Sequence, residues 1–184
     1  MLITWNCDGL LTGDGVKVAQ LRKCAEELDA AVIALQEVKE PVAPDALLGF
    51  GQYRVVARQD RPAKKGADPV RGGGVVLLAR KGRGVKQAFL RAGTGFELVA
   101  ADDPVSGHRV VSIYRAPDPA MDTIPLMEAI SDAINGSKLS PIVVGDLNYD
   151  PAQLDREGPG VCALHNFLRD ALGWVNTVDF TTRA

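Results

Sequence analysis

The sequence predicts an α/β protein whose strands form a two-sheet sandwich with helices on the outside. The first observation is a strand–helix–strand opening over residues 2–38, and the second is a run of three closely linked strands over residues 85–117. The third is a pair of amphipathic helices after residue 122. Strands that alternate with helices favour mixed layers of sheet and helix. A length of 184 residues suits one domain, residues 1–184.

The opening segments show both periodicities. LITWN (2–6) has strand character, and the continuous apolar run AAVIALQEV (30–38) predicts a buried strand, parallel to the first. Between them, residues 16–29 have the spacing of an amphipathic helix. Its predicted inward face comprises Val18, Leu21, Ala25 and Leu28.

The middle of the chain is expected to be irregular at first and then all strand. Residues 38–71 contain four prolines, and their basic part, 61–71, is expected to be a mobile surface loop, with phosphate contact as the alternative. A strand that begins with glycines follows at 70–82. Three further strands, VKQAFLRAG, GFELVAAD and HRVVSIYRAP, predict an antiparallel meander.

Two helices and a strand are predicted in the last third. Asp122 is expected to cap a helix that ends at Asn135-Gly136, with an inward face of Leu126, Ala129, Ile130 and Ala133. PIVVGD (141–146) predicts a buried strand. Residues 160–173 predict a helix whose inward face comprises Val161, Leu164, Leu168 and Ala171, and residues 174–180 begin another strand.

Composition restricts the class of partner. Apolar residues make up 46% of the chain and charged residues 24%, as in globular proteins, and no apolar run is long enough to cross a membrane. The net charge of −2 gives no overall attraction to nucleic acid, so any such contact requires a local basic patch. Three widely spaced cysteines form no metal pair or disulfide framework, which favours an intracellular location.

Three predicted strands end in unusual polar residues. Asn6 and Asp8 follow the first strand, Glu37 follows the second, and Asp146 and Asn148 follow PIVVG. A single carboxylate after a strand is usually a turn former, but ligands gather where the carboxyl ends of strands meet. A group of carboxylates and amides without nearby histidine or cysteine suits Mg²⁺ or Mn²⁺. Asp150, followed by a proline, is expected to begin a turn.

ITWNCDGL, IALQEVKE and VVGDLNYD, in that order, resemble the signature segments of the endonuclease/exonuclease/phosphatase superfamily of metal-dependent phosphodiesterases. Within it, GGGVVLLAR, VVSIYRAP and the C-terminal LHNFLRDALGWVNTVDFTTRA are similar to abasic-site nucleases and, in particular, to endonuclease domains of non-LTR retrotransposons. The resemblance implies a DNA endonuclease that nicks one strand by in-line attack of water. A phosphatase of the same superfamily is the nearest alternative.

The resemblance also implies a role for each site residue. Glu37 would be the principal metal ligand with Asp8, and Asp146 would orient or deprotonate the attacking water. Asn148 would contact the scissile phosphate, and Tyr114 falls where the family places a phosphate-contacting tyrosine. Asn6 would complete the metal end of the site or simply hydrogen-bond Glu37. The candidate DNA contacts are Arg115, Lys64, Lys65 and Arg71.

The family's pattern continues with a Ser-Asp-His segment that this sequence does not contain. His108, in a predicted turn, and His165, in a predicted helix, are expected to be structural or solvent-exposed and do not replace it. By comparison with the family, the chain is expected to be incomplete at its C-terminus and to lack its last strands. An uncovered sheet edge would then favour self-association. The missing segment also leaves open a third function, a relative that binds DNA or a partner without cutting.

Overall fold

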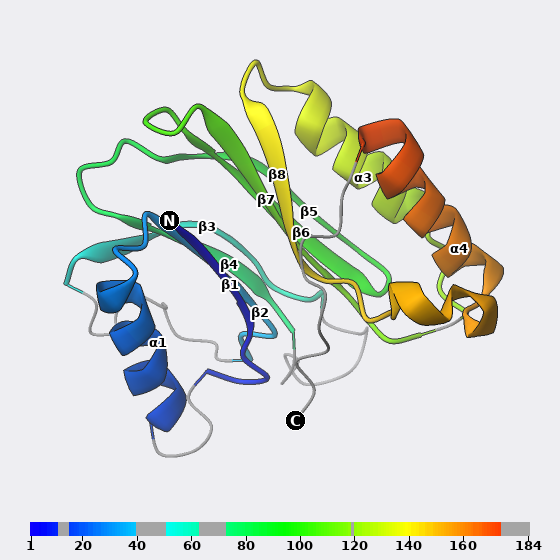
Figure 1. Cartoon of the computed structure of the whole chain (residues 1–184), viewed down its shortest axis with the longest axis horizontal. Coiled ribbons are helices and arrows are strands. Elements are labelled where there is room, and N and C mark those ends of the chain that lie inside the picture. The colour runs from blue at the N-terminus through cyan, green and yellow to red at the C-terminus, as the bar shows by residue number, and fades with distance from the viewer. Residues whose placement is uncertain (11–14, 40–50, 63–72, 119, 174–184) are drawn as a thin grey trace.

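Two four-stranded sheets pack face to face, and helices cover both outer faces (Figure 1). The computed structural model describes residues 1–10, 15–39, 51–62, 73–118 and 120–173. The layers follow the order α1, first sheet, second sheet, and then α3 with α4 (Figure 1). This is the predicted two-sheet α/β sandwich with outer helices.

The first sheet has the strand order β1-β2-β4-β3. β1 is parallel to β2, whereas β4 is antiparallel to both β2 and β3. The helix α1 (Val16–Glu27) lies on the outer face of this sheet (Figure 1). The strands are β1 (Leu2–Asn6), β2 (Val32–Gln36), β3 (Tyr53–Gln59) and β4 (Val75–Arg80).

The second sheet has the order β5-β6-β7-β8, with an antiparallel meander followed by one parallel strand. The strands are β5 (Lys86–Gly93), β6 (Phe96–Asp103), β7 (His108–Arg115) and β8 (Ser140–Asp146). Its outer face carries α3 (Ile124–Asn135) and α4 (Pro159–Asn166); α4 runs on into a π-helical turn, Phe167–Ala171. A short 3-10 segment, Pro151–Arg156, lies between β8 and α4.

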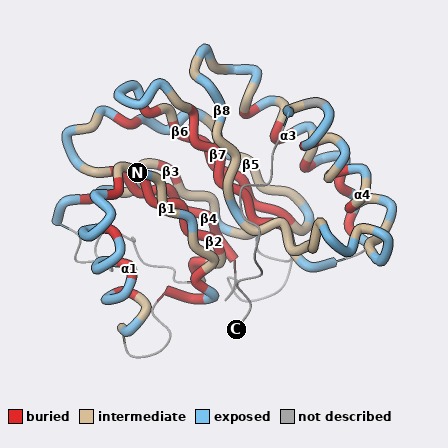
Figure 2. Tube along the Cα trace, in the orientation of Figure 1, coloured by how far each residue is buried: buried red, intermediate tan, exposed pale blue. Residues whose placement is uncertain are grey.

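Burial is deepest in the central strands of both sheets (Figure 2). In β2, Ile33 and Leu35 pack under α1, and Val32 and Ala34 face the second sheet. Side chains alternate between the two faces of a strand, so covering both faces buries the whole of β2 and explains its unbroken apolar run.

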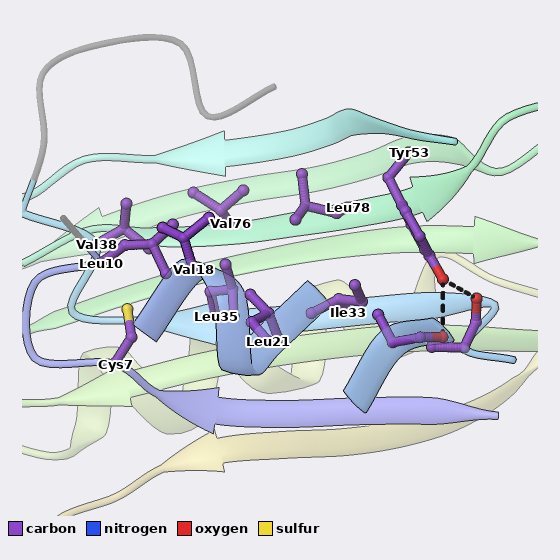
Figure 3. Close-up of a cluster of buried hydrophobic side chains, with 12 residues drawn as sticks. Cys7, Leu10, Val18, Leu21, Ile33, Leu35, Val38, Tyr53, Val76 and Leu78 are labelled. Atoms are coloured by element: carbon purple, nitrogen blue, oxygen red, sulfur yellow. Dashed lines mark hydrogen bonds between the residues drawn. The ribbon is translucent and has the colours of Figure 1, made fainter. Parts of the chain in front are cut away.

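The contact between α1 and the first sheet shows how the helix is held (Figure 3). Val18 and Leu21 of α1 pack against β2 and β4 side chains. At the far end of this cluster the Tyr53 hydroxyl donates to the carbonyl oxygen of Ala30, 2.7 Å away, and reaches that of Ala25 at 3.4 Å. The hydroxyl therefore ties β3 to the chain that leaves α1.

Most of the predicted elements are confirmed. The meander forms as expected, and Leu126, Ala129, Ile130 and Ala133 of α3 are fully buried. The Asp122 carboxylate accepts a hydrogen bond from the backbone N–H of Ile124, so it does support the start of α3. Val161, Leu164 and Leu168 are buried as predicted, whereas the side chain of Ala171 and the strand expected at 174–180 lie outside the described residues.

Three predictions about packing are wrong. Leu28 is 44% exposed because α1 ends at Glu27, before Leu28 can join its inward face. β3 forms inside the segment expected to be irregular. Ile142 to Val144 of β8 are only half-buried, because β8 is the last strand in the order of its sheet.

In the part of the chain that the structure describes, no helix has the length and apolarity needed to cross a membrane.

Candidate active site

The candidate site lies where the two parallel strand pairs end. In the first sheet Asn6 of β1 is paired with Gln36 of β2. In the second, Tyr114 of β7 is paired with Asp146 of β8. The two edge strands β1 and β8 lie near one another across the sandwich, so both pairs deliver their carboxyl ends to the same place. Loop side chains converge over such strand ends in α/β sheets.

The Asn6 amide joins the two sheets at this point. Its Nδ2 donates to Glu37 Oε1 at 2.8 Å and to Asp146 Oδ2 at 2.6 Å. Glu37 and Asp146, which are 109 positions apart in the sequence, therefore lie on either side of a single amide group. The structure favours the second of the two roles expected for Asn6, because its amide nitrogen binds carboxylates.

The remaining acidic residue, Asp8, lies on the outer side of Glu37. The Lys39 ammonium contacts Asp8 Oδ1 and lies 3.6 Å from Glu37 Oε2, so one cation already faces both carboxylates. Its hydrogen bond to Asp8 holds the pKa of that carboxyl below its usual value, and the same bond raises the pKa of Lys39. Asp8 is largely exposed, so solvent screens this pair strongly.

Both oxygens of Asp146 are held in place. Oδ2 accepts from Asn6, and Oδ1 accepts from the backbone N–H of Asn148 at 2.8 Å. The Asn148 side chain in turn donates through Nδ2 to the carbonyl oxygen of Arg115 at 2.6 Å. The loop after β8 is thereby fixed to the end of β7, and the Asp146 carboxylate has one defined orientation.

Arg115 occupies a different place from the one that a DNA contact requires. Its guanidinium is only 1% exposed and donates to the carbonyl oxygens of Leu147, Asn148 and Asp118. Successive residues of a strand point to opposite faces, so Arg115 lies on the face of β7 opposite Tyr114. We therefore assign Arg115 to the support of the loop after β8, in place of the substrate contact that the sequence suggested.

The Tyr114 side chain faces the interior between the two sheets, at the end of that interior where the polar site residues lie. Burial raises the pKa of its phenol above the usual value, and the negative charges of Glu37 and Asp146 raise it further. The neighbouring Arg61 guanidinium opposes this rise and favours a lower pKa. The phenol therefore keeps its proton at neutral pH and can donate a hydrogen bond.

Three of the candidate residues have left-handed backbones. The φ angles are 41° at Asp8, 54° at Glu37 and 48° at Asn148, and each residue lies within two positions of the end of the strand that delivers it. This conformation is uncommon outside glycine and costs about 1 kcal/mol or more per residue. Such strain persists only where the surroundings impose it, and it concentrates at functional sites.

Gly145 explains how β8 reaches the site. Its φ is 136°, and a Cβ atom built on it would lie 1.9 Å from the carbonyl oxygen of Ile113 on β7. A side chain at 145 would therefore force β8 away from β7, one residue before Asp146. The glycine therefore allows the close approach of the two neighbouring strands.

A model of the Endonuclease/Exonuclease/phosphatase family matches residues 3–184. The chain belongs to this family. A search of curated protein sequences found no significant match.

Solved structures of family members share the fold. The human Nocturnin catalytic domain is 15% identical with a TM-score of 0.63, over 93% of this chain and 69% of that one. The 3′ phosphatase NExo from Neisseria, bound to a product DNA hairpin, is 21% identical with a TM-score of 0.56, over 84% of this chain and 60% of that one. D. rerio TDP2, in complex with a single-strand DNA product, is 18% identical with a TM-score of 0.57, over 84% of this chain and 62% of that one. The chain thus spans less than two thirds of the length of the NExo and D. rerio TDP2 chains.

The donor set fits a hard divalent cation. Asp8 and Glu37 supply carboxylate oxygens, and the position of Lys39 against both shows that they attract positive charge there. Among the described residues no three histidine, cysteine or carboxylate side chains are grouped closely enough to enclose a metal. Mg²⁺ commonly binds through one or two carboxylates and keeps several waters, so two ligands suffice.

Sequence reasoning missed several residues that build the site. Lys17 of α1 donates to the carbonyl oxygens of Cys7, Asp8 and Gly9 and so fixes the chain after β1. Gln36 Nε2 donates to Ser112 Oγ at 2.8 Å, which links the sheets beneath the site. These are contacts between distant segments, for which the sequence carries no local signal; Lys39, two residues after Glu37, could have been found from its spacing.

The remaining candidates lie elsewhere. Lys64, Lys65 and Arg71 are outside the described residues, so their expected contact with DNA stays a prediction. His165, on α4, has its Nδ1 3.3 Å from the Tyr149 hydroxyl, and His108 Nδ1 lies 3.3 Å from the carbonyl oxygen of Ser140. Both histidines have the structural contacts that were expected of them. Asp150 accepts from the backbone N–H of Ala152 and caps the 3-10 segment.

Proposed function

We propose that this protein is a divalent-metal-dependent phosphodiesterase that nicks one strand of DNA. The observation that carries the proposal is the Asn6 amide, which holds Glu37 and Asp146 together from opposite sheets. Membership of a family that includes nucleases and phosphatases supports hydrolysis of a phosphoester. DNA as the substrate is the narrower part of the proposal.

Each residue has a task in this reaction. Glu37 and Asp8 would hold Mg²⁺ or Mn²⁺, which when bound neutralises charge on the phosphate oxygens. Asp146 has its oxygens fixed by Asn6 and by the Asn148 backbone, so it can accept a hydrogen bond from one water in one orientation. A water held in this way is placed for in-line attack on phosphorus.

The protonated Tyr114 phenol supplies the neutral donor of the site. Because its pKa is raised, the phenol can donate to a non-bridging oxygen of the phosphate as negative charge builds there. Asn148 orients Asp146 through its backbone and anchors the loop through its side chain. Direct contact of its amide with the phosphate remains part of the proposal.

A plasmid assay tests the proposal. Purified protein is incubated with supercoiled plasmid in Mg²⁺, in Mn²⁺ and in EDTA, together with the variants Glu37→Ala and Asp146→Asn. Glu26→Ala, which removes an exposed carboxylate of α1, is the matched control. We expect metal-dependent nicking that is retained by the control and reduced at least about 100-fold in both site variants. If both site variants nick the plasmid as fast as the wild type, the proposal is wrong.

The same reagents separate the two alternatives. A 3′-phosphorylated oligonucleotide that loses phosphate under metal dependence, with no plasmid nicking, would point to a phosphatase. DNA binding without hydrolysis of either substrate would point to a binding module, the third function considered.

We also infer self-association through the edge that β8 forms on the second sheet in the described part of the chain. In the described part of the chain β8 is paired only with β7, and Ile142 to Val144 are half-buried. A strand edge with free backbone groups and apolar side chains favours pairing with another chain. Light scattering after gel filtration measures the molar mass while the protein concentration is varied over about a 50-fold range. A constant monomer mass would exclude self-association.

A further inference from the structure

An ion pair with a buried carboxylate lies between the sheets beside the candidate site. Glu97 of β6 is completely buried, and Arg61, which follows β3, binds it through two nitrogens: Nε to Oε1 at 2.7 Å and Nη2 to Oε2 at 3.3 Å. Arg61 thus reaches from the first sheet into the second. Nothing in the reaction proposed above uses either residue.

The pair adjoins Tyr114. Glu97 is paired with Tyr114 across β6 and β7, and Tyr114 is paired with Asp146 across β7 and β8. Side chains at paired positions of neighbouring strands point to the same face. The three therefore form one row directed at the first sheet, and the Arg61 Cζ atom lies 5.0 Å from the centre of the Tyr114 ring.

The surroundings are shaped around the guanidinium. A Cβ atom on Gly73 would lie 2.6 Å from both Cζ and Nε of Arg61, so a side chain at 73 would displace the guanidinium from its present position. Gly73 has a φ of 86°, which also favours glycine. Arg61 therefore binds Glu97, lies beside the Tyr114 ring and occupies the space that a side chain at 73 would need.

Stability alone does not account for this pair. Glu97 is fully buried and Arg61 is partly exposed, and burying even one charge is costly, so apolar residues of similar size often replace such a pair without loss of stability. A planar, two-point contact instead fixes a guanidinium in one orientation, which a lysine cannot do. A fixed cation over a tyrosine ring restrains that ring and attracts it.

We propose that Arg61, anchored by buried Glu97, is a positioning residue that fixes the Tyr114 phenol at the edge of the acidic centre. The kinetic consequence rests on the proposed phosphodiesterase function. The structural consequence does not, because it concerns the environment of Tyr114 in the free protein.

Tyrosine NMR tests the structural consequence. The chain has three tyrosines, so labelling their Cζ atoms with ¹³C gives three signals, and Tyr114→Phe identifies the relevant one. The informative variant is Arg61→Met with Glu97→Gln, which removes both charges and leaves no buried carboxylate unpaired. The matched control is Arg83→Met with Asp103→Asn, which removes a similar arginine–carboxylate pair whose nitrogen and oxygen are 2.9 Å apart.

We expect the Tyr114 signal to shift or broaden in the Arg61 double variant at neutral pH. The signals of Tyr53 and Tyr149 should stay in place, and the control pair should leave Tyr114 unchanged. A Tyr114 signal that is identical to the wild type in the folded double variant overturns the proposal. Should that variant not fold, Arg61→Lys, which keeps the charge beside Glu97 and loses the planar contact, is held to the same criterion.

Kinetics on a nicking substrate give the second readout. Misplacing a group that acts in the transition state lowers kcat and leaves ground-state binding little changed, so we expect kcat to fall about 10- to 100-fold and KM to stay within about twofold. An equal loss through KM alone would assign Arg61 to substrate binding and overturn the positioning role. A wild-type protein without hydrolytic activity would defeat the proposed function, and the NMR result would still decide the role of Arg61.

Discussion

Replacing Asn6 with aspartate tests the electrostatic design of the site. The amide now donates two hydrogen bonds to carboxylates, at 2.8 and 2.6 Å. A carboxylate of the same shape would place oxygen against oxygen at both contacts. The exchange turns two attractive contacts into two repulsive ones without changing the size of the side chain.

The expected cost follows from these contacts. Two like charges about 4 Å apart at an effective dielectric constant of about 20 repel by about 4 kcal/mol. Asn6 is half-buried, so water and side-chain rotation relieve part of this repulsion. We expect Asn6→Asp to lower the free energy of unfolding by about 3–5 kcal/mol, and Asn6→Ala, which only loses hydrogen bonds to charged groups, by about 1–3 kcal/mol.

Urea denaturation in EDTA measures both values. The control Asn166→Asp makes the same charge change on an exposed residue of α4 and should stay within about 0.5 kcal/mol of the wild type. Adding Mg²⁺ or Mn²⁺ should stabilise Asn6→Asp more than the wild type, because the extra charge strengthens cation binding to the native state. If Asn6→Asp is no less stable than Asn6→Ala, the three side chains do not share one site and the reasoning fails.

Three further changes test other parts of the structure. Gly145→Ala should lower the free energy of unfolding by about 3–5 kcal/mol, measured by urea denaturation, because a Cβ would lie 1.9 Å from the Ile113 carbonyl oxygen; a loss below about 1 kcal/mol would contradict that contact. Tyr53→Phe should cost about 1–2 kcal/mol in the same assay through the unpaired Ala30 carbonyl, and no loss would show that its 2.7 Å bond is not formed. Burial alone would raise the pKa of Asp103, but hydrogen bonds, chiefly from Arg83, hold that pKa below its usual 3.8. The ionised Asp103 therefore contributes stability above this pH, and the contribution is lost as the pH falls below it. Between about pH 5 and 2, the free energy of unfolding of Asp103→Asn should therefore fall less steeply with falling pH than that of the wild type. Parallel curves would contradict the lowered pKa of Asp103.

The convergence of Asn6, Glu37 and Asp146 could be predicted from the sequence for a physical reason. Each follows an apolar run long enough to be a strand, and the carboxyl ends of parallel strands meet at one edge. The packing of β8 could not be predicted in the same way. Its apolar run shows that it forms a strand, but whether a further strand lies beside it depends on segments elsewhere in the chain.

The two arginines beside the site show a second kind of limit. Arg115 follows Tyr114 directly, so the alternation of side chains along a strand already implies that they point to opposite faces. That inference was available from the sequence. The pairing of Arg61 with Glu97 was not, because it depends on the register of β6 against β7 and on how the two sheets are stacked. β3 was missed because the prolines on either side of it outweighed its own alternation.

Glycine would relax the backbone at Asp8, Glu37 and Asn148, since it alone adopts their positive φ angles at little cost. Directed evolution that selects only for thermal stability should therefore enrich glycine at these three positions and yield a more stable but inactive protein. Among the positions at which such a search departs from the natural residue, these three would mark the candidate site, with no substrate needed to find it.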